Sequence, residues 1–437
     1  MLSVRGEAGS GKTILALQLL SALSSKLKPI YISSRVTPQK LYSSYPWVKS
    51  SLPADAVVDA TKPSEEGGLG MLRYIDKPSF IRALVGLLER RGEAVAAVDS
   101  VEGVKSSIGA DFMDLSLEED LIALAEGHGC RLILLYEGSK AADYLADGVV
   151  ELSYSDYEGA RLRRINIRKL RGYSVEKPER VFTLDGGRLR ALPHSPVYRY
   201  PTGVKWKPKP EREGYFTAGI PLLDELVGGL PAGGTLLLSL EDNVPSEAVC
   251  SILYPMLADF VSKGRPIFLL PSHSVVLLPA FLSILKYFEN LMDLFLHAIE
   301  KEMAGKMDKF HVVYRAGEAY SLYREWLKRC RAASGGKPVL SVVGLDTLEH
   351  RFELRDAIAA LSRMVSDVRR FGWLLVLIST SSSPELSGVA ATVAGRHIRL
   401  EYRLGAVVVR GVKPSTFTVA VEPLREGEAV PELVKLV

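Results

Sequence analysis

Few features of this 437-residue sequence point to a secreted, membrane-bound or metal-centred protein. Its three cysteines, Cys130, Cys250 and Cys330, are far apart and lack metal-ligand spacing, so we expect reduced thiols in a cytoplasmic protein. No signal-peptide pattern precedes the first expected strand. The uncharged run 266–285 contains three prolines and a histidine, which favours a buried strand, turn and helix over a membrane span.

Amide side chains are also scarce, with glutamine only at Gln18 and Gln39 and asparagine only at Asn166, Asn243 and Asn290. Two explanations stay open: a thermophilic source, or a biased genomic composition. The net charge of +4 is too small to favour nucleic acid or another acidic partner. Hydrophobic residues at 47% and charged residues at 24% are ordinary for a soluble globular protein.

A phosphate-binding loop begins at the sixth residue. The pattern G-x-x-x-x-G-K-T predicts that backbone N–H groups surround phosphates, that Lys12 reaches the β/γ oxygens, and that the Thr13 hydroxyl ligates Mg²⁺. A strand-like run at 2–5 precedes the loop, and helical spacing over 14–27 follows it, as this motif requires. We therefore expect ATP and Mg²⁺ to bind here. The residues expected to contact the nucleotide are Gly6, Glu7, Ala8, Gly9, Ser10, Gly11, Lys12, Thr13 and Ile14.

Asp99 is the expected second metal-binding residue. It ends the apolar strand-like run 94–98, and a carboxylate at that point holds Mg²⁺ through water opposite the loop hydroxyl. The alternative is a helix-capping aspartate. Thr13 and Asp99 together form the predicted metal site, and Lys12 and Asp99 the core of the predicted catalytic set.

The chain contains an internal repeat. Residues 25–32 are echoed by 262–269, 129–135 by 372–378, and the stretch from Asp99 to Glu102 by the stretch from Asp346 to Glu349. Strands alternating with helical patterns predict an α/β fold with two tandem, mainly parallel sheets flanked by helices. We expect a nucleotide-binding domain at 1–193, a proline- and lysine-rich linker at 194–214, and a second domain at 215–437.

The second copy has lost the phosphate-binding chemistry. The loop from Gly6 to Thr13 aligns with the segment from Leu240 to Glu247, which has no glycine, contains a proline and carries a serine in place of the lysine. Its acidic residues would repel a polyphosphate. We expect a degenerate domain that keeps the fold, and a structural role for Asp346.

The segment 216–234, which contains T-A-G-I-P-L-L-D-E-L-V-G-G-L-P, resembles the lead-in of KaiC-like ATPases of the RecA superfamily. In that family the lead-in precedes the first core strand and the P-loop, which is its place here relative to 235–240. The first copy starts at its strand without this lead-in. Either the start is misassigned or the first domain lacks that edge.

Within the superfamily, the chain looks most like the archaeal gas-vesicle protein D group. The segments that carry this resemblance are Y-I-S-S-R-V-T at 31–37, the aromatic cluster at 41–47, L-A-D-G-V-V-E-L at 145–152 and R-K-L-R-G at 168–172. The general resemblance covers both copies, and the subgroup match is specific mainly for 1–190. It implies an ATP-binding regulator, with gas-vesicle control as the role that names the group.

The resemblance also raises a doubt about hydrolysis. KaiC-like enzymes generally place two glutamates after the strand that follows the P-loop helix, whereas this chain has Ser33, Ser34 and Arg35 there. Without a carboxylate to take the proton, we expect slow or absent hydrolysis. Glu102 and Glu137 are substitute candidates, although Glu102 has a counterpart, Glu349, in the degenerate copy.

Relatives use a Lys-x-Arg pair to reach the γ-phosphate of a neighbouring subunit, which makes Lys169 and Arg171 the remaining catalytic candidates. A solvated basic strand is the alternative. The surrounding run from 161 to 171 contains six cations and could instead follow a nucleic-acid backbone, but it lacks interleaved aromatic residues.

Two functions fit these observations. The first is a regulatory protein in which ATP binding to one site changes contact with a protein partner or with a second copy. The second is a RecA-type ATPase that acts on DNA, which the fold and the basic run favour. The sequence does not choose a partner, and we expect nucleotide binding more firmly than turnover.

Overall fold

The computed structural model describes residues 1–63, 70–157, 160–194, 196–199, 206–277, 295–297, 319–428 and 430–437. The chain forms two compact units, Met1–His194 with Leu436–Val437, and Ser195–Lys435. Each unit is an α/β sheet domain, as the repeat predicts. No helix among the described residues is long and apolar enough to cross a bilayer. The expected helix at the end of the 266–285 run falls outside the described residues.

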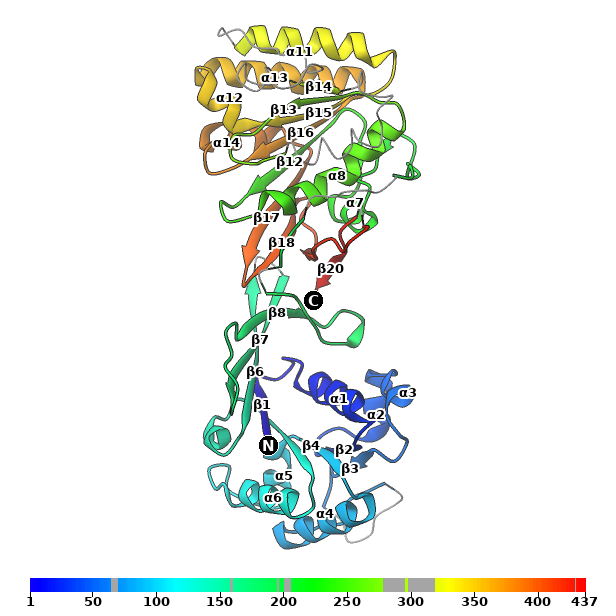
Figure 1. The fold of residues 1–437 in the computed structure, drawn as a ribbon, viewed down its shortest axis with the longest axis vertical. Coiled ribbons are helices and arrows are strands. Elements are labelled where there is room, and N and C mark those ends of the chain that lie inside the picture. Colours follow the sequence, from blue (N-terminus) through cyan, green and yellow to red (C-terminus); the bar gives the residue numbers. More distant parts are fainter. Residues whose placement is uncertain are drawn as a thin grey trace. The chain divides into compact units, whose positions relative to one another are not determined.

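The first unit is built on a nine-stranded sheet of order β3-β2-β4-β5-β1-β6-β7-β8-β9 (Figure 1). The strands from β3 to β6 in this order pair in parallel, and β6 to β9 pair antiparallel. The strands are β1 Leu2–Gly6, β2 Lys28–Ser33, β3 Val57–Asp59, β4 Ala94–Asp99, β5 Arg131–Tyr136, β6 Gly148–Tyr157, β7 Ala160–Leu170, β8 Glu179–Thr183 and β9 Arg190–Ala191.

Helices connect the parallel strands of this unit and cover both faces of its sheet. The α-helices are α1 Lys12–Leu23, α2 Pro38–Ser44, α3 Val48–Ser51, α4 Lys77–Arg91, α5 Val101–Ser107 and α6 Ser116–Gly127, and the 3₁₀ turns are η1 Ala141–Tyr144 and η2 Asp185–Gly187. Apolar residues alternate along the strands, so Tyr31 packs on the α1 side while Ile30 and Ile32 pack on the opposite side. Both faces are therefore buried, as expected for parallel strands.

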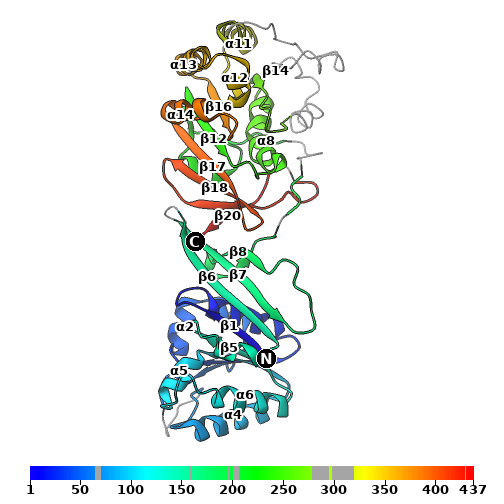
Figure 2. The ribbon, with the colours of Figure 1, turned by 90° about the vertical axis from the view of Figure 1, so that its left-hand side faces the viewer.

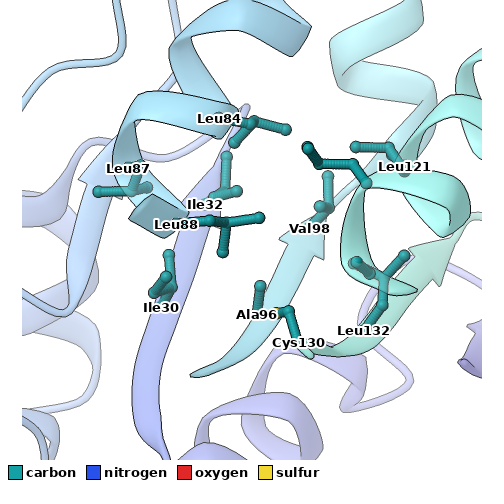
Figure 3. Close-up of a pocket in the computed structure, with 12 residues that line it drawn as sticks. Ile30, Ile32, Leu84, Leu87, Leu88, Ala96, Val98, Leu121, Cys130 and Leu132 are labelled. Atoms are coloured by element: carbon teal, nitrogen blue, oxygen red, sulfur yellow. The ribbon is translucent and has the colours of Figure 1, made fainter. Parts of the chain in front are cut away.

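An apolar pocket lies on the face opposite α1 (Figure 3). It is lined by residues of β2, β4, β5, α4 and α6, among them Ile32, Leu84, Val98 and Leu121. Cys130 is its one titratable lining residue, and burial raises the pKa of this thiol. The pocket therefore lacks the groups that would recognise a phosphate, and the P-loop helix packs on the other face.

The second unit repeats this topology strand for strand. Its nine-stranded sheet has the order β14-β13-β15-β16-β12-β17-β18-β19-β20, again parallel up to β17 and antiparallel from β17 through β19. The strands are β12 Gly234–Leu240, β13 Ile267–Leu270, β14 Phe295–His297, β15 Leu340–Gly344, β16 Leu374–Ser379, β17 Arg396–Arg403, β18 Ala406–Lys413, β19 Thr418–Val421 and β20 Leu433–Leu436, with the short hairpin β10 Tyr215–Phe216 and β11 Leu230–Pro231 preceding them.

Helices of the second unit also form two layers (Figure 2). One face of the sheet packs on α7 Pro221–Val227 and α8 Ser246–Ser262. The other face packs on α11 Ala319–Ser334, α12 Leu345–Arg351, α13 Leu354–Phe371 and α14 Pro384–Val393. The α/β prediction of two mainly parallel sheets flanked by helices is thus confirmed in both units.

Strand register aligns the two P-loop positions. Gly6 lies opposite Leu152 of β6, and Leu240 lies opposite Leu400 of β17. Five residues then separate β1 from α1 and, equally, β12 from α8, since the helices begin at Lys12 and Ser246. The second unit therefore keeps the length of the loop but not its backbone conformation, since the residue before the helix has φ of +105° at Gly11 and −62° at Pro245.

Register also corrects one part of the repeat. In the first unit, Asp99 of β4 lies opposite Leu135 of β5. In the second unit, Ile378 of β16 is the equivalent of Leu135, and the residue opposite it is Gly344 of β15. The counterpart of Asp99 is therefore Gly344 and not Asp346. Asp346 lies in the first turn of α12, where its carboxylate accepts hydrogen bonds from Ser272 Oγ and Ser274 N, both at 2.8 Å. The sequence match slips by two residues here, and the second unit has no carboxylate at the metal-binding position.

The described part of the predicted linker packs against the second unit. Trp206 is buried, and its indole N–H and the Lys209 backbone N–H both donate to Asp259 of α8, at 3.3 and 2.7 Å. Glu211 forms a bidentate ion pair with Arg265, with both distances 2.8 Å. These contacts place residues 206–211 with the second unit.

A buried ion pair fixes the helix that follows Asp99. Lys105 of α5 lies 2.8 Å from Glu118 of α6, with side-chain exposures of 2% and 1%, and it also donates to the Asp114 carbonyl at 2.7 Å. Lys105→Met should lower the free energy of unfolding of this region by about 3 kcal/mol, because Glu118 would remain as an unpaired buried charge. Hydrogen exchange at the α5 and α6 amides of the full chain measures this loss.

Lys77→Met is the matched control, because Lys77 pairs with Asp120 of α6 at 2.8 Å with both side chains partly exposed. We expect a change within about 0.5 kcal/mol for this surface pair. Equal loss of protection in the two variants would contradict a special role for the buried pair.

Candidate functional site

The P-loop lies between β1 and α1, at the end of the sheet where the parallel strands finish. A Cβ on Gly6 would lie 2.1 Å from the carbonyl oxygen of Leu152, and Gly11 has φ of +105° with its missing Cβ directed at Leu184, 3.3 Å away. Side chains are therefore excluded at both ends of the loop, and the backbone can approach a ligand closely. Glu7, Ala8 and Gly9 form the exposed tip.

Lys12 begins α1 and turns back onto the loop. Its ammonium donates to the carbonyl oxygens of Gly6 at 2.7 Å and Glu7 at 2.9 Å, and the residue is only 7% exposed. Burial lowers the pKa of Lys12, and the carboxylates of Glu137, Asp99 and, less strongly, Glu102 oppose this shift. The lysine is thus held at the loop, within the field of three carboxylates.

Thr13 and Asp99, the two residues of the predicted metal site, form a hydrogen bond with each other. The Thr13 hydroxyl donates to Asp99 Oδ2 at 2.6 Å, and Tyr31 donates its phenol to the same oxygen. Burial, followed by the charge of Asp99, raises the pKa of Tyr31 well above its ordinary value, so this tyrosine stays a donor. Two hydroxyl groups from α1 and β2 therefore orient the carboxylate.

Ser34 and Glu102 form hydrogen bonds that connect the ends of neighbouring strands. The Ser34 hydroxyl donates to the carbonyl oxygens of Asp99 and Ser100, each at 3.0 Å, and accepts the Ser100 N–H at 2.9 Å. Glu102 accepts the backbone N–H of Glu137 at 2.7 Å, and burial raises the pKa of Glu102. Glu102 thus joins the ends of β4 and β5, which is a structural role.

Arg163 of β7 holds the loop tip. It is 8% exposed, and its guanidinium donates to the Gly9 carbonyl oxygen at 2.8 Å. The other cations of the basic run also have partners within the first unit. These contacts are Arg161 with the Tyr154 ring, Arg164 with Ser155, Arg168 with Glu151, Lys169 with the Asp143 carbonyl and Arg171 with Asp147.

Lys169 and Arg171 are not brought to the P-loop of their own chain. Leu170 pairs with Gly148, which pairs with Leu2, so this end of β7 lies at the start of β1. Gly6 marks the other end of β1, four residues further along, and at about 3.3 Å per residue this is roughly 13 Å away. Any action of the Lys-x-Arg pair on a phosphate would therefore need a site in another copy.

The first unit fits MgATP by its donor set. The loop has no side chains at its two ends, Lys12 supplies a cation, and the fully buried Ser10 hydroxyl has no hydrogen-bond partner among the described residues. Thr13 and Asp99 supply hard oxygen ligands of the kind Mg²⁺ prefers. Ile14, the last residue expected to contact the nucleotide, is buried in α1 directly after Thr13.

In the equivalent loop of the second unit, the acidic side chains are hydrogen-bonded to other residues of the same unit. Both carboxylate oxygens of Glu241 accept hydrogen bonds from Arg403, at 2.7 Å each, and Ser381 donates to Asp242. Ser246, in place of the lysine, accepts the Val276 N–H at 3.1 Å. Among the described residues no cluster of three or more His, Cys, Asp or Glu could hold a metal ion in either unit.

Residues 1–169 match the family described as "GvpD gas vesicle protein, P-loop domain". The first unit is therefore similar to GvpD P-loop domains. The whole chain is also similar to two proteins of Halobacterium salinarum over 99% of its length and 92% of theirs. It is 27% identical to Protein GvpD2 over 470 residues and 23% identical to Protein GvpD1 over 505 residues. The GvpD-like resemblance is therefore confirmed, and it extends beyond the P-loop domain.

Three features of this GvpD-like site were not predicted from the sequence as site residues. Tyr31 orients Asp99, Arg163 anchors the loop tip, and Arg35 forms an ion pair with Glu137. Tyr31 had a usable signal, because a tyrosine in a buried aliphatic strand needs a partner for its hydroxyl. Arg163 had none, since its contact depends on how β7 folds beside β6.

Tyr31→Phe removes one of the two donors that orient Asp99. We expect the Mg²⁺-dependent part of ATP affinity to fall about tenfold or more, which corresponds to losing one hydrogen bond of about 1.5 kcal/mol to a charged group. Affinity measured in EDTA should stay unchanged. Fluorescence titration with a labelled ATP analogue, with and without Mg²⁺, measures both.

Tyr74→Phe serves as the control, because Tyr74 is also buried and hydrogen-bonded, to the Ala60 carbonyl at 2.7 Å, on the face away from α1. Equal losses of Mg²⁺ dependence in both variants would show that Tyr31 acts through stability alone.

Proposed function

We propose that this GvpD-like chain is a cytoplasmic regulator of gas-vesicle formation that binds MgATP at one site and uses nucleotide occupancy to change its contact with a protein partner or a second copy. The observation that carries the proposal is the contrast between two loops of equal length. In the first, Thr13 and Asp99 meet at 2.6 Å beside Lys12. In the second, Glu241 is paired with Arg403 and no lysine is present.

Slow hydrolysis is part of this proposal. The strand end that carries glutamates in KaiC-like enzymes here carries Ser34, which is committed to the backbone of Asp99 and Ser100. Glu102 is committed to a backbone N–H, and Glu137 to Arg35. No carboxylate stands among the described residues 34–37 that follow β2, where KaiC-like enzymes carry their glutamates, so bound ATP would persist long enough to act as a signal.

Action on DNA is less well supported. A nucleic-acid backbone needs cations that are free to neutralise phosphates. Each of the six cations between 161 and 171 instead has a partner within the first unit. This pairing supports a protein partner over nucleic acid.

Nucleotide binding and turnover of the full chain, with and without single- and double-stranded DNA, test the proposal. We expect one MgATP per chain and turnover slower than about 10⁻² s⁻¹. Lys12→Ala should lower ATP affinity by about 100-fold, equivalent to about 2.8 kcal/mol, because it removes the buried cation at the loop. Lys26→Ala, at an exposed lysine beyond α1, should change nothing.

Two results would overturn the proposal. Fast turnover stimulated by DNA would favour the RecA-type alternative. Two nucleotides per chain, with one retained in Lys12→Ala, would show that the second unit also binds.

Lys169 and Arg171 remain proposed as groups that act on the site of a neighbouring copy, where these two side chains alone would exchange their present contacts with Asp143, Tyr144 and Asp147 for a phosphate. Arg171→Ala should then weaken ATP binding by about tenfold at protein concentrations where copies associate. Adding Lys12→Ala chains, which carry Arg171 but no working loop, should restore the affinity. Arg168→Ala, at the exposed neighbour paired with Glu151, is the control. Wild-type affinity of Arg171→Ala at every concentration would remove the pair from the site.

A further inference from the structure

Arg35 and Glu137 form an ion pair across the candidate site. Arg35 follows β2 and Glu137 follows β5, and β4 lies between these strands in the sheet. Their side chains nevertheless meet, with Nη1 2.5 Å from Oε1. The pair therefore spans the end of β4, where Asp99 is located.

The position of Arg35 is built into the local packing. A Cβ on Gly103 of α5 would lie 2.2 Å from Ser34 Oγ and 3.2 Å from Arg35 Cγ, so only glycine leaves room for these side chains. Ser34 is itself fixed to the backbone at Asp99 and Ser100. The base of the Arg35 side chain is held by this packing, and the side chain as a whole is 46% exposed.

The pair also lies within the field of the P-loop lysine. Glu137 is the carboxylate that acts most strongly on Lys12, and Arg35 acts on Lys12 with the opposite sign. Lys12 is the residue expected to meet the β- and γ-phosphates. A terminal phosphate bound there would attract Arg35 and repel Glu137.

We propose that Arg35 is a terminal-phosphate sensor that pairs with Glu137 when no γ-phosphate is bound and transfers its guanidinium to the γ-phosphate of ATP when one is. This inference rests on the proposed binding of ATP by the P-loop. It assigns Arg35 a role at a position where KaiC-like enzymes carry an acidic residue. ADP leaves Arg35 on Glu137, because it has no phosphate within reach of the guanidinium.

The exchange gives the protein two distinguishable states. With ADP or no nucleotide, the ends of β2 and β5 are tied together by the ion pair. With ATP, Glu137 is released at the exposed start of the segment that follows β5. A partner that contacts this edge would encounter a free carboxylate only in the ATP state.

The test compares ATP and ADP affinities in Mg²⁺ by equilibrium titration. Arg35→Ala should lower ATP affinity about tenfold and leave ADP affinity within about twofold, so the preference for ATP falls. Glu137→Gln should raise ATP affinity about threefold or more, because it removes both the competing partner and a repelling charge. In Arg35→Ala, the added Glu137→Gln change should have a smaller effect, since only the repulsion remains to be removed.

Arg329→Ala and Glu325→Gln are the matched controls. These residues form an arginine–glutamate pair at 2.8 Å on α11 of the second unit, and neither change should alter either affinity. Circular dichroism of every variant checks that the fold is kept.

Three outcomes separate the inference from the proposed function. A wild-type chain that binds no ATP would overturn the proposed function and this inference together. A wild-type chain that binds ATP, with equal losses of ATP and ADP affinity in Arg35→Ala, would overturn only the sensor. Additive effects of Arg35→Ala and Glu137→Gln would show that the two residues do not exchange partners.

Discussion

Parallel hydrogen bonding of β1 to β5 on one side and β6 on the other is the constraint on which the candidate site depends. Parallel strands bring all their carboxyl ends to one edge of the sheet. The sheet itself therefore brings the site residues together at this edge, without the need for long loops. They are the P-loop after β1, Asp99 at the end of β4, Arg35 after β2 and Glu137 after β5. The same ladder carries Lys169 and Arg171 to the opposite edge, because β7 runs antiparallel to β6.

The second unit shows that this framework survives without nucleotide chemistry. Its strands follow the same order and its loop has the same length, so the fold does not require glycine or lysine there. The second loop instead satisfies its own charges, with Glu241 held by Arg403. A loop stabilised internally in this way has no need of a ligand. In the first loop, the buried Ser10 hydroxyl has no hydrogen-bond partner among the described residues, and Lys12 donates to carbonyl groups of the loop. A bound ligand could supply partners to both side chains.

Sequence reasoning reached the fold class, the P-loop and the meeting of Thr13 with Asp99, because these depend on local spacing and on strand order. It failed where a contact depends on register between distant segments. The pairing of Asp99 with Asp346 followed a four-residue likeness, whereas β-sheet register, which that likeness does not encode, puts Gly344 at that position. Arg163 and the Arg35–Glu137 pair were missed as site features for the same reason, since each joins residues about 100 or more positions apart.

The charges at the site give a physical reason why the proposed nucleotide would bind together with a metal ion. Lys12 and Arg35 contribute two positive charges, against three negative charges from Glu137, Asp99 and Glu102, so the charges that act on this loop sum to −1 when all five groups are ionised. A polyphosphate alone would add to that excess, in a partly buried place where charges are weakly screened. A Mg²⁺ ion held by Thr13 and Asp99 would offset part of it. The proposed transfer of Arg35 from Glu137 to the γ-phosphate would reduce the repulsion further, because it would move a positive charge to the place where the negative charge is greatest.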